Sequence, residues 1–86
     1  MNELEIKNRA TLAAQVLDNP VYQAALITIK GSLVQRMGDI KPTDVAELQE
    51  VARTLQNLDK LEKNIVSVMK AGKVLDFKKE RKLFNF

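Results

Sequence analysis

The longest regular pattern in the chain is a stretch from residue 43 to residue 71 in which apolar and polar positions recur at helical spacing. Its main apolar residues are separated by steps of three or four, the spacing of one helix face, whereas a strand needs steps of two. We therefore predict one long helix, about 43 Å in length. Its apolar stripe, predicted as the core of a hairpin or of an oligomer, consists of Leu48, Val51, Leu55, Leu58, Leu61, Ile65 and Val68.

Two shorter helices are predicted before it, over residues 2–17 and 20–37. The first has an alanine-rich stripe that begins at Ile6 and ends at Leu17, and the second has apolar residues at steps of three and four from Tyr22 to Met37. Asn19-Pro20 separates them, because asparagine suits the position that caps a helix and proline suits its first turn. A β-hairpin over Ile27–Val34 is the alternative for the second segment, although no third strand is present to support it.

The three glycines and one aspartate predict how these helices begin, end and cross. Gly31 lies inside the second predicted helix, where it indicates a close helix crossing or a kink. Gly38 and Gly72 are predicted to end the second and the long helix, as glycine often does just past a C-terminus. Thr43 or Asp44 is predicted to cap the long helix, and Asp44, three residues before Glu47, has the spacing of a capping box.

The predicted architecture is all-α: a short N-terminal helix, an antiparallel, coiled-coil-like helical hairpin, and a basic-aromatic tail. Residues 1–72 form the hairpin and oligomerisation domain, and residues 73–86 form the tail. The three-residue step between Leu58 and Leu61 breaks the heptad register, so the long helix is not a coiled coil by itself. Two uses of the stripe stay open: a hairpin within one chain, or a hairpin that also oligomerises through the remaining apolar residues Val45, Val66 and Met69.

The chain is small, with 86 residues, and it contains neither cysteine nor histidine. Disulfides are excluded by this composition, and the zinc sites that small domains commonly use are not expected. A domain of this size buries only about 60–65% of the surface that its unfolded chain exposes. Oligomerisation is the remaining common source of stability, so we expect a homo-oligomer.

The positive charge is concentrated at the C-terminus. Residues 70–86 contain six lysines and arginines against two acidic residues, and all three phenylalanines lie in the last ten residues. Cations neutralise nucleic-acid phosphates, whereas terminal aromatic residues favour docking to a protein; a merely solubilising end is the simpler alternative. The predicted nucleic-acid-binding residues are Lys70, Lys73, Lys78, Lys79, Arg81 and Lys82, and the predicted partner-docking residues are Leu83, Phe84 and Phe86.

Several functional classes are not expected from this composition. Catalysis is not, because acid-base and nucleophilic chemistry would depend on scattered carboxylates, lysines and one tyrosine. No phosphate-binding or calcium-binding loop occurs, so neither a cofactor nor a metal is predicted. No apolar run is long enough to span a membrane, and the first residues lack the pattern of a signal peptide. The expected location is the cytoplasm.

A set of short features resembles small helical proteins encoded in the head and DNA-packaging region of phage genomes. These features are Asn19-Pro20, the turn Lys41-Pro42-Thr43-Asp44, the Leu-rich helix from Leu48 to Leu61, and Gly72-Lys73. Among such proteins, the chain most resembles the short terminase small subunits of short-tailed phages. The segment Leu33-Val34-Gln35-Arg36-Met37, followed by an acidic turn and another helix, is similar to theirs.

The resemblance implies a non-enzymatic, ring-forming protein that binds viral DNA and regulates the large terminase subunit in the host cytoplasm, with association with the virion as a further option. Many members carry an N-terminal helix-turn-helix, but residues 1–18 are too short to contain one. DNA contact would then come from the oligomer surface or from the basic tail. The alternatives are a small nucleic-acid-binding regulator and an inhibitor or adaptor that binds a host protein.

Overall fold

The computed structural model describes the backbone of residues 2–84 and the side chains of residues 2–78. Within this range the chain forms three helices: α1 (Glu3–Asp18), α2 (Pro20–Asp39) and α3 (Val45–Phe84). The prediction of an all-α fold is confirmed. The β-hairpin alternative over Ile27–Val34 is wrong, because this whole segment is helical.

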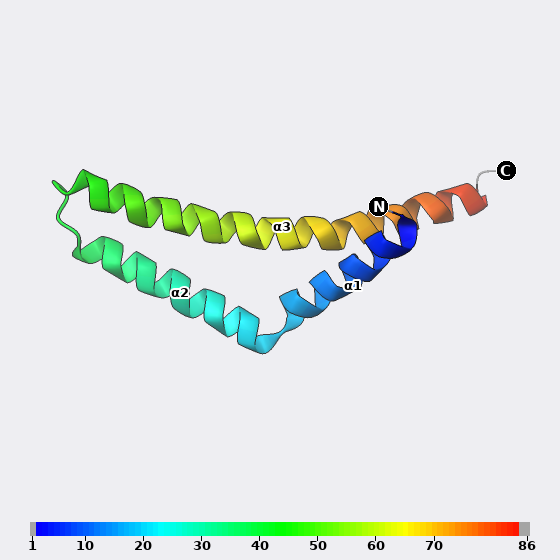
Figure 1. The fold of residues 1–86 in the computed structure, drawn as a ribbon, viewed down its shortest axis with the longest axis horizontal. Helices are drawn as coiled ribbons and strands as arrows, with labels where there is room; N and C mark the ends of the chain where they lie inside the picture. The colour runs from blue at the N-terminus through cyan, green and yellow to red at the C-terminus, as the bar shows by residue number, and fades with distance from the viewer. Residues whose placement is uncertain (1, 85–86) are drawn as a thin grey trace.

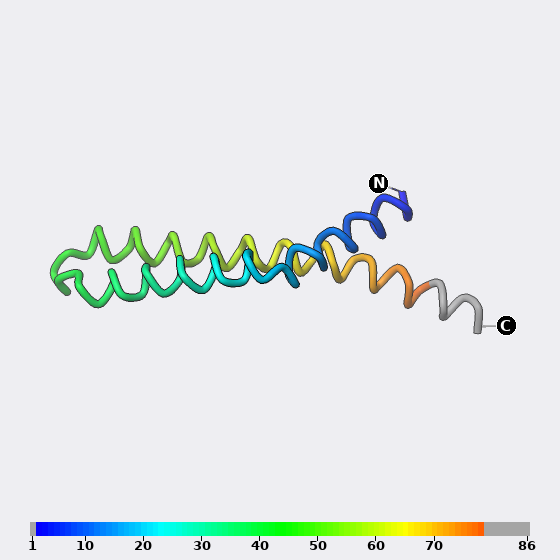
Figure 2. The backbone as a smooth tube through the Cα atoms, turned by 90° about the horizontal axis from the view of Figure 1, so that it is seen from below, coloured from blue at the N-terminus to red at the C-terminus, as the bar shows by residue number. Residues whose placement is uncertain are grey.

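The helices are arranged as two antiparallel arms. Helices α1 and α2 follow one another as a single bent arm, and α3 runs back along both of them as the other arm (Figure 1). The views in Figures 1 and 2 agree that α2 lies beside the first half of α3 and α1 beside its second half. We predicted α2 as the partner of the long helix, but α1 makes the more extensive contact with it.

The bend between α1 and α2 is formed by the predicted Asn19-Pro20 pair. The Asn19 side-chain oxygen accepts hydrogen bonds from the backbone N–H groups of Val21 (2.9 Å) and Tyr22 (3.1 Å). Pro20 occupies the first turn of α2, where its missing N–H removes no helical hydrogen bond. The Gln23 side-chain amide donates to the Leu17 carbonyl (2.7 Å) and satisfies an acceptor at the end of α1.

The other predicted helix boundaries were partly correct. The Glu47 backbone N–H donates to the Asp44 carboxylate at 3.2 Å, so Asp44 caps α3 as expected. Gly38 does not follow the end of α2, since the helix continues through it to Asp39. Gly72 does not end α3, which continues to Phe84. Neither glycine has the positive φ angle of a C-terminal cap.

The fold is elongated and has a small core. Its dimensions are 64 × 25 × 21 Å and its radius of gyration is 18.7 Å, against about 12 Å for a compact domain of this length. Its buried apolar side chains are Ala10, Ala13, Leu26 and Val51, and Val51 is the most fully enclosed, with 1% of its surface exposed. Since most large apolar residues lie outside this core, their faces remain open to solvent or to a partner.

Candidate functional site

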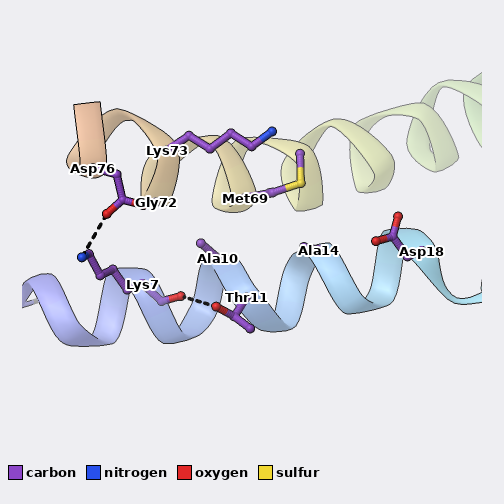
Figure 3. Close-up of a pocket in the computed structure, with 9 residues that line it drawn as sticks. All are labelled: Lys7, Ala10, Thr11, Ala14, Asp18, Met69, Gly72, Lys73 and Asp76. Carbon is purple, nitrogen blue, oxygen red and sulfur yellow. Dashed lines mark hydrogen bonds and ion pairs between the residues drawn. The ribbon is translucent and has the colours of Figure 1, made fainter. Parts of the chain in front are cut away.

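Helices α1 and α3 approach each other closely where they cross (Figure 3). Ala10 of α1 faces Gly72 of α3, and a Cβ atom added at Gly72 would overlap the Ala10 methyl group. Glycine inside a helix costs up to about 1 kcal/mol relative to alanine, but here it allows two helix backbones to approach closely. Gly72 is therefore a packing residue, which explains why α3 does not end there.

An ion pair lies one turn beyond this crossing. The Lys7 ammonium lies 2.9 Å from the Asp76 carboxylate, and the two side chains keep 39% and 59% of their surface exposed. The Lys7 carbonyl accepts a hydrogen bond from the Thr11 hydroxyl at 3.1 Å, and Figure 3 shows both interactions. Because exposed ion pairs contribute little free energy, Lys7 and Asp76 fix the alignment of the helices more than they stabilise the contact.

Ion pairs also connect α2 to α3. Lys30 pairs with Glu62, and Arg36 lies 3.2 Å from Glu47. The hydrogen bond to Glu62 raises the pKa of Lys30 above its ordinary value, against the opposing effect of desolvation. Both cations of α2 are thereby directed to the acidic residues of α3, which leaves the opposite side of α2 without a positive charge.

The bend between α1 and α2 encloses a partly open cavity of about 300 Å³. Its apolar lining is completed by the Lys30–Glu62 pair and the Gln23 side chain. The apolar residues that line it are Leu17, Tyr22, Leu26 and Ile27. The Tyr22 hydroxyl is buried and has no hydrogen-bond partner among the described residues. The cavity thus combines apolar side chains with one buried phenol hydroxyl and one ion pair.

The predicted apolar stripe of α3 is turned toward the other arm only in part. Val51 is buried, whereas Leu61 keeps 50% of its surface exposed. The stripe rotates around α3 because its three-residue step at Leu58 departs from the heptad. The remaining members are half-buried: Leu48, Leu55, Leu58, Ile65 and Val68.

The predicted nucleic-acid-binding residues are only partly within the described side chains. Lys70, Lys73 and Lys78 are exposed on the last described turns of α3. The side chains of Lys79, Arg81, Lys82, Leu83 and Phe84 lie outside the described residues, as does Phe86 entirely. The backbone of α3 is helical through Phe84.

The sequence prediction missed a pair of apolar side chains among these lysines. Val74 and Phe77, which are 52% and 62% exposed, lie three residues apart on the same side of α3 as Lys70. Their spacing was visible in the sequence, but the assumed helix end at Gly72 assigned them to a separate tail. The C-terminal part of α3 is thus a basic, partly apolar helix surface.

The prediction also missed how much of the shorter helices is uncovered. Several large apolar side chains there keep more than 40% of their surface exposed: Leu4, Leu12, Val16, Val21, Ile27, Ile29 and Val34. All of them except Ile29 lie outside the stripes used for the prediction, and Ile29 belongs to the predicted stripe of the second helix. Exposed apolar residues suggest contact with another molecule where they share one face of a helix, as Ile27 and Val34 do at a spacing of seven.

Two further searches of the described residues were negative. They contain no group of three or more carboxylates that could hold a metal ion, and none of their helices is long and apolar enough to cross a membrane. Comparison with known protein families, with curated protein sequences and with solved structures finds no match for this chain.

Proposed function

We propose that this protein is a non-enzymatic assembly protein that works as a homo-oligomer. The observation that carries the proposal is the amount of surface left uncovered. One chain exposes 6941 Å², about 1,800 Å² more than a compact monomer of this mass. A stable interface removes about 800 Å² from each partner, so one chain has enough excess surface for at least one such contact.

In its most specific form, the proposal is a phage terminase small subunit that binds viral DNA and regulates the large terminase in the host cytoplasm. The sequence resemblance from Asn19 to Lys73 supports it, together with the exposed Lys70, Lys73 and Lys78. The basic helical end of α3 provides charges that suit a phosphate backbone. The proposal requires that the protein forms a homo-oligomer and that it has a cationic surface for DNA. Each requirement has its own test.

The first test is the molar mass in solution, measured by light scattering during size-exclusion chromatography. The expected result is a mass that is a multiple of 9.7 kDa at micromolar protein concentration. Sedimentation equilibrium over a hundredfold range of concentration gives the stoichiometry. A stable monomer throughout this range would contradict the homo-oligomer.

The second test is DNA binding by the cationic end of the chain. If Lys78, Lys79, Arg81 and Lys82 contact phosphates, the logarithm of the binding constant should fall by roughly 0.9 per contact for each tenfold increase in salt. Replacing all four with glutamine should abolish binding. A matched variant neutralises four basic residues elsewhere (Arg9, Lys41, Arg53 and Lys60) and should keep most of the affinity. Equal losses in both variants would show that the end of α3 has no special role.

The third test is truncation of residues 83–86. We expect the truncated protein to keep its helix content and molar mass but to lose capture of the large terminase subunit, because partner binding energy concentrates in a few aromatic anchors. Circular dichroism and light scattering provide the control for folding. Unfolding on truncation would assign these residues to the protein's own core and would contradict their role in docking.

A further inference from the structure

One exposed side of α2 has an unbroken heptad pattern. Apolar and small residues recur there with steps of 4, 3, 4, 3 and 4, whereas the stripe of α3 contains a break. This surface, named here the outer face of α2, consists of Pro20, Ala24, Ile27, Gly31, Val34 and Gly38.

The outer face is open in the single chain. Ile27 and Val34 keep 72% and 59% of their surface exposed. A Cβ atom added at Gly31 or at Gly38 would meet nothing within 4 Å. All six residues of the face are exposed in the single chain, and Figure 1 shows α3 running along one side of α2 only. We expected Gly31 to mark a close helix crossing or a kink, and among the described residues no other helix crosses α2 closely at this glycine.

The chemistry of the outer face distinguishes it from an ordinary solvated helix surface. A helix that faces water on one side normally carries charged residues there. The charged residues of α2 are Lys30, Arg36 and Asp39; the first two pair with acidic residues of α3, and none belongs to the outer face. An uncharged apolar face offers no complement to a charged peptide or to nucleic acid, and it suits another uncharged helix.

Large and small residues alternate along this face in a way that defines the partner. Ile27 and Val34 occupy one heptad position, while Ala24, Gly31 and Gly38 occupy the other. In an antiparallel helix pair the two positions face one another, so each large residue meets a small one. In a parallel pair each position would face itself, which would place Ile27 against Ile27 and glycine against glycine.

We propose that the outer face of α2 is a homodimer interface in which α2 of a second copy packs antiparallel across it, with Ile27 opposite Gly31 of the other copy. This register pairs Ala24 with Val34 and Pro20 with Gly38, so it covers the whole length of α2. The glycines allow the helix axes to approach to about 8 Å, the lower end of the usual range. The inference rests on the homo-oligomer proposed above and assigns one of its contacts.

The surface that the whole chain exposes beyond that of a compact monomer is larger than one standard interface needs. The chain exposes about 1,800 Å² more than a compact monomer, and a standard interface needs about 800 Å² from each partner. Pairing through α2 would therefore leave other exposed residues, such as Leu12 and Leu61, for higher assembly. The dimer is the first step of such an assembly.

The orientation is tested with single cysteines, since the natural chain contains none. Thr28 and Val21 lie one heptad apart along the same edge of the outer face. Antiparallel pairing places Thr28 beside Thr28 of the second copy, near the twofold axis, and separates the two Val21 residues. With a short bifunctional maleimide, Thr28→Cys should give a covalent dimer and Val21→Cys should not. Equal cross-linking of both variants, or of neither, would overturn the proposal.

The close approach is tested by Gly31→Gln, with Ser32→Gln as the matched control. Glutamine at residue 31 has open space in the single chain and a higher helix propensity than glycine, so helix content should be kept. It should raise the dimer dissociation constant at least tenfold in sedimentation equilibrium, whereas Ser32→Gln should change it less than threefold. If the protein is an oligomer that neither variant weakens, this interface is wrong and the proposed function stands. A monomeric wild type would contradict both.

Discussion

Gly72 at the α1–α3 crossing and Gly31 on the outer face of α2 both lie inside a helix, but only Gly72 is enclosed by another helix. Gly72 is enclosed because the Ala10 methyl group occupies the space where its side chain would be. Gly31 also lies in a helix interior, and nothing lies within 4 Å of the corresponding position. Both glycines lower the helix propensity of their segments. Only at Gly72 does a contact within the chain compensate for that loss, so Gly31 indicates a contact that one chain does not make.

The same contrast exists between the two sides of α2. Its inner side holds the buried Leu26 and sends Lys30 and Arg36 to acidic partners on α3. The outer face of α2 exposes Ile27 and contains no charged residue. Two adjacent residues of α2 therefore have different roles, because neighbouring positions of a helix point in different directions. Leu26 stabilises the single chain, whereas Ile27 remains available for association.

The largest expected effect comes from these adjacent residues of α2. Leu26→Ala should lower the free energy of unfolding by about 2–5 kcal/mol, because it leaves a cavity in the core. Ile27→Ala should change it by less than about 0.5 kcal/mol at a protein concentration where the chain is monomeric. Urea denaturation followed by circular dichroism measures both values. Equal losses at low concentration would show that the two sides of α2 do not differ.

The next effect separates the two glycines. Gly72→Ala should lower the free energy of unfolding by about 1–3 kcal/mol, because the new methyl group overlaps Ala10. Gly31→Ala should raise it by about 0.5–1 kcal/mol, because the substitution improves helix propensity without a clash. The opposite signs make this pair a sharp test by thermal or urea denaturation. Stabilisation by both substitutions would mean that α1 and α3 are not in close contact at Gly72.

The smallest effect concerns the exposed pair within α3. Lys63 lies 2.9 Å from Asp59, and its hydrogen bond and charge lower the pKa of that carboxyl below the ordinary value of 3.8. A carboxyl whose pKa is lower in the folded state contributes stability above its unfolded pKa and loses it as the pH falls through the folded pKa. Asp59→Asn should therefore melt slightly earlier than wild type at pH 7.

The difference between Asp59→Asn and wild type should disappear in acid well below pH 3.8, where the carboxyl is protonated in both states. It should also shrink at molar salt concentrations, because salt screens exposed charges. Lys60→Gln, which changes a neighbouring exposed charge of α3, is the control. A difference that persists in acid would show that the substitution acts through something other than this ion pair.

Much of the local structure could be predicted from the sequence because it depends on near neighbours in the chain. The cap at Asn19, the start of α2 at Pro20 and the cap at Asp44 need only residues two or three positions away. The Asp59–Lys63 pair follows from helix spacing in the same way. Less of the candidate surfaces could be predicted, because the periodicity of Val74 and Phe77 does not say whether another helix covers them.

The sequence by itself determined that the chain is helical, where most helices begin, and that the basic residues gather near the C-terminus. The tertiary structure alone decided which apolar residues are enclosed and what each glycine does. Gly72 was a plausible helix end until Ala10, 62 positions earlier in the chain, was found against it. Helix propensity is a property of neighbouring residues, whereas burial depends on which distant segments share a surface, and a glycine has no side chain to indicate either.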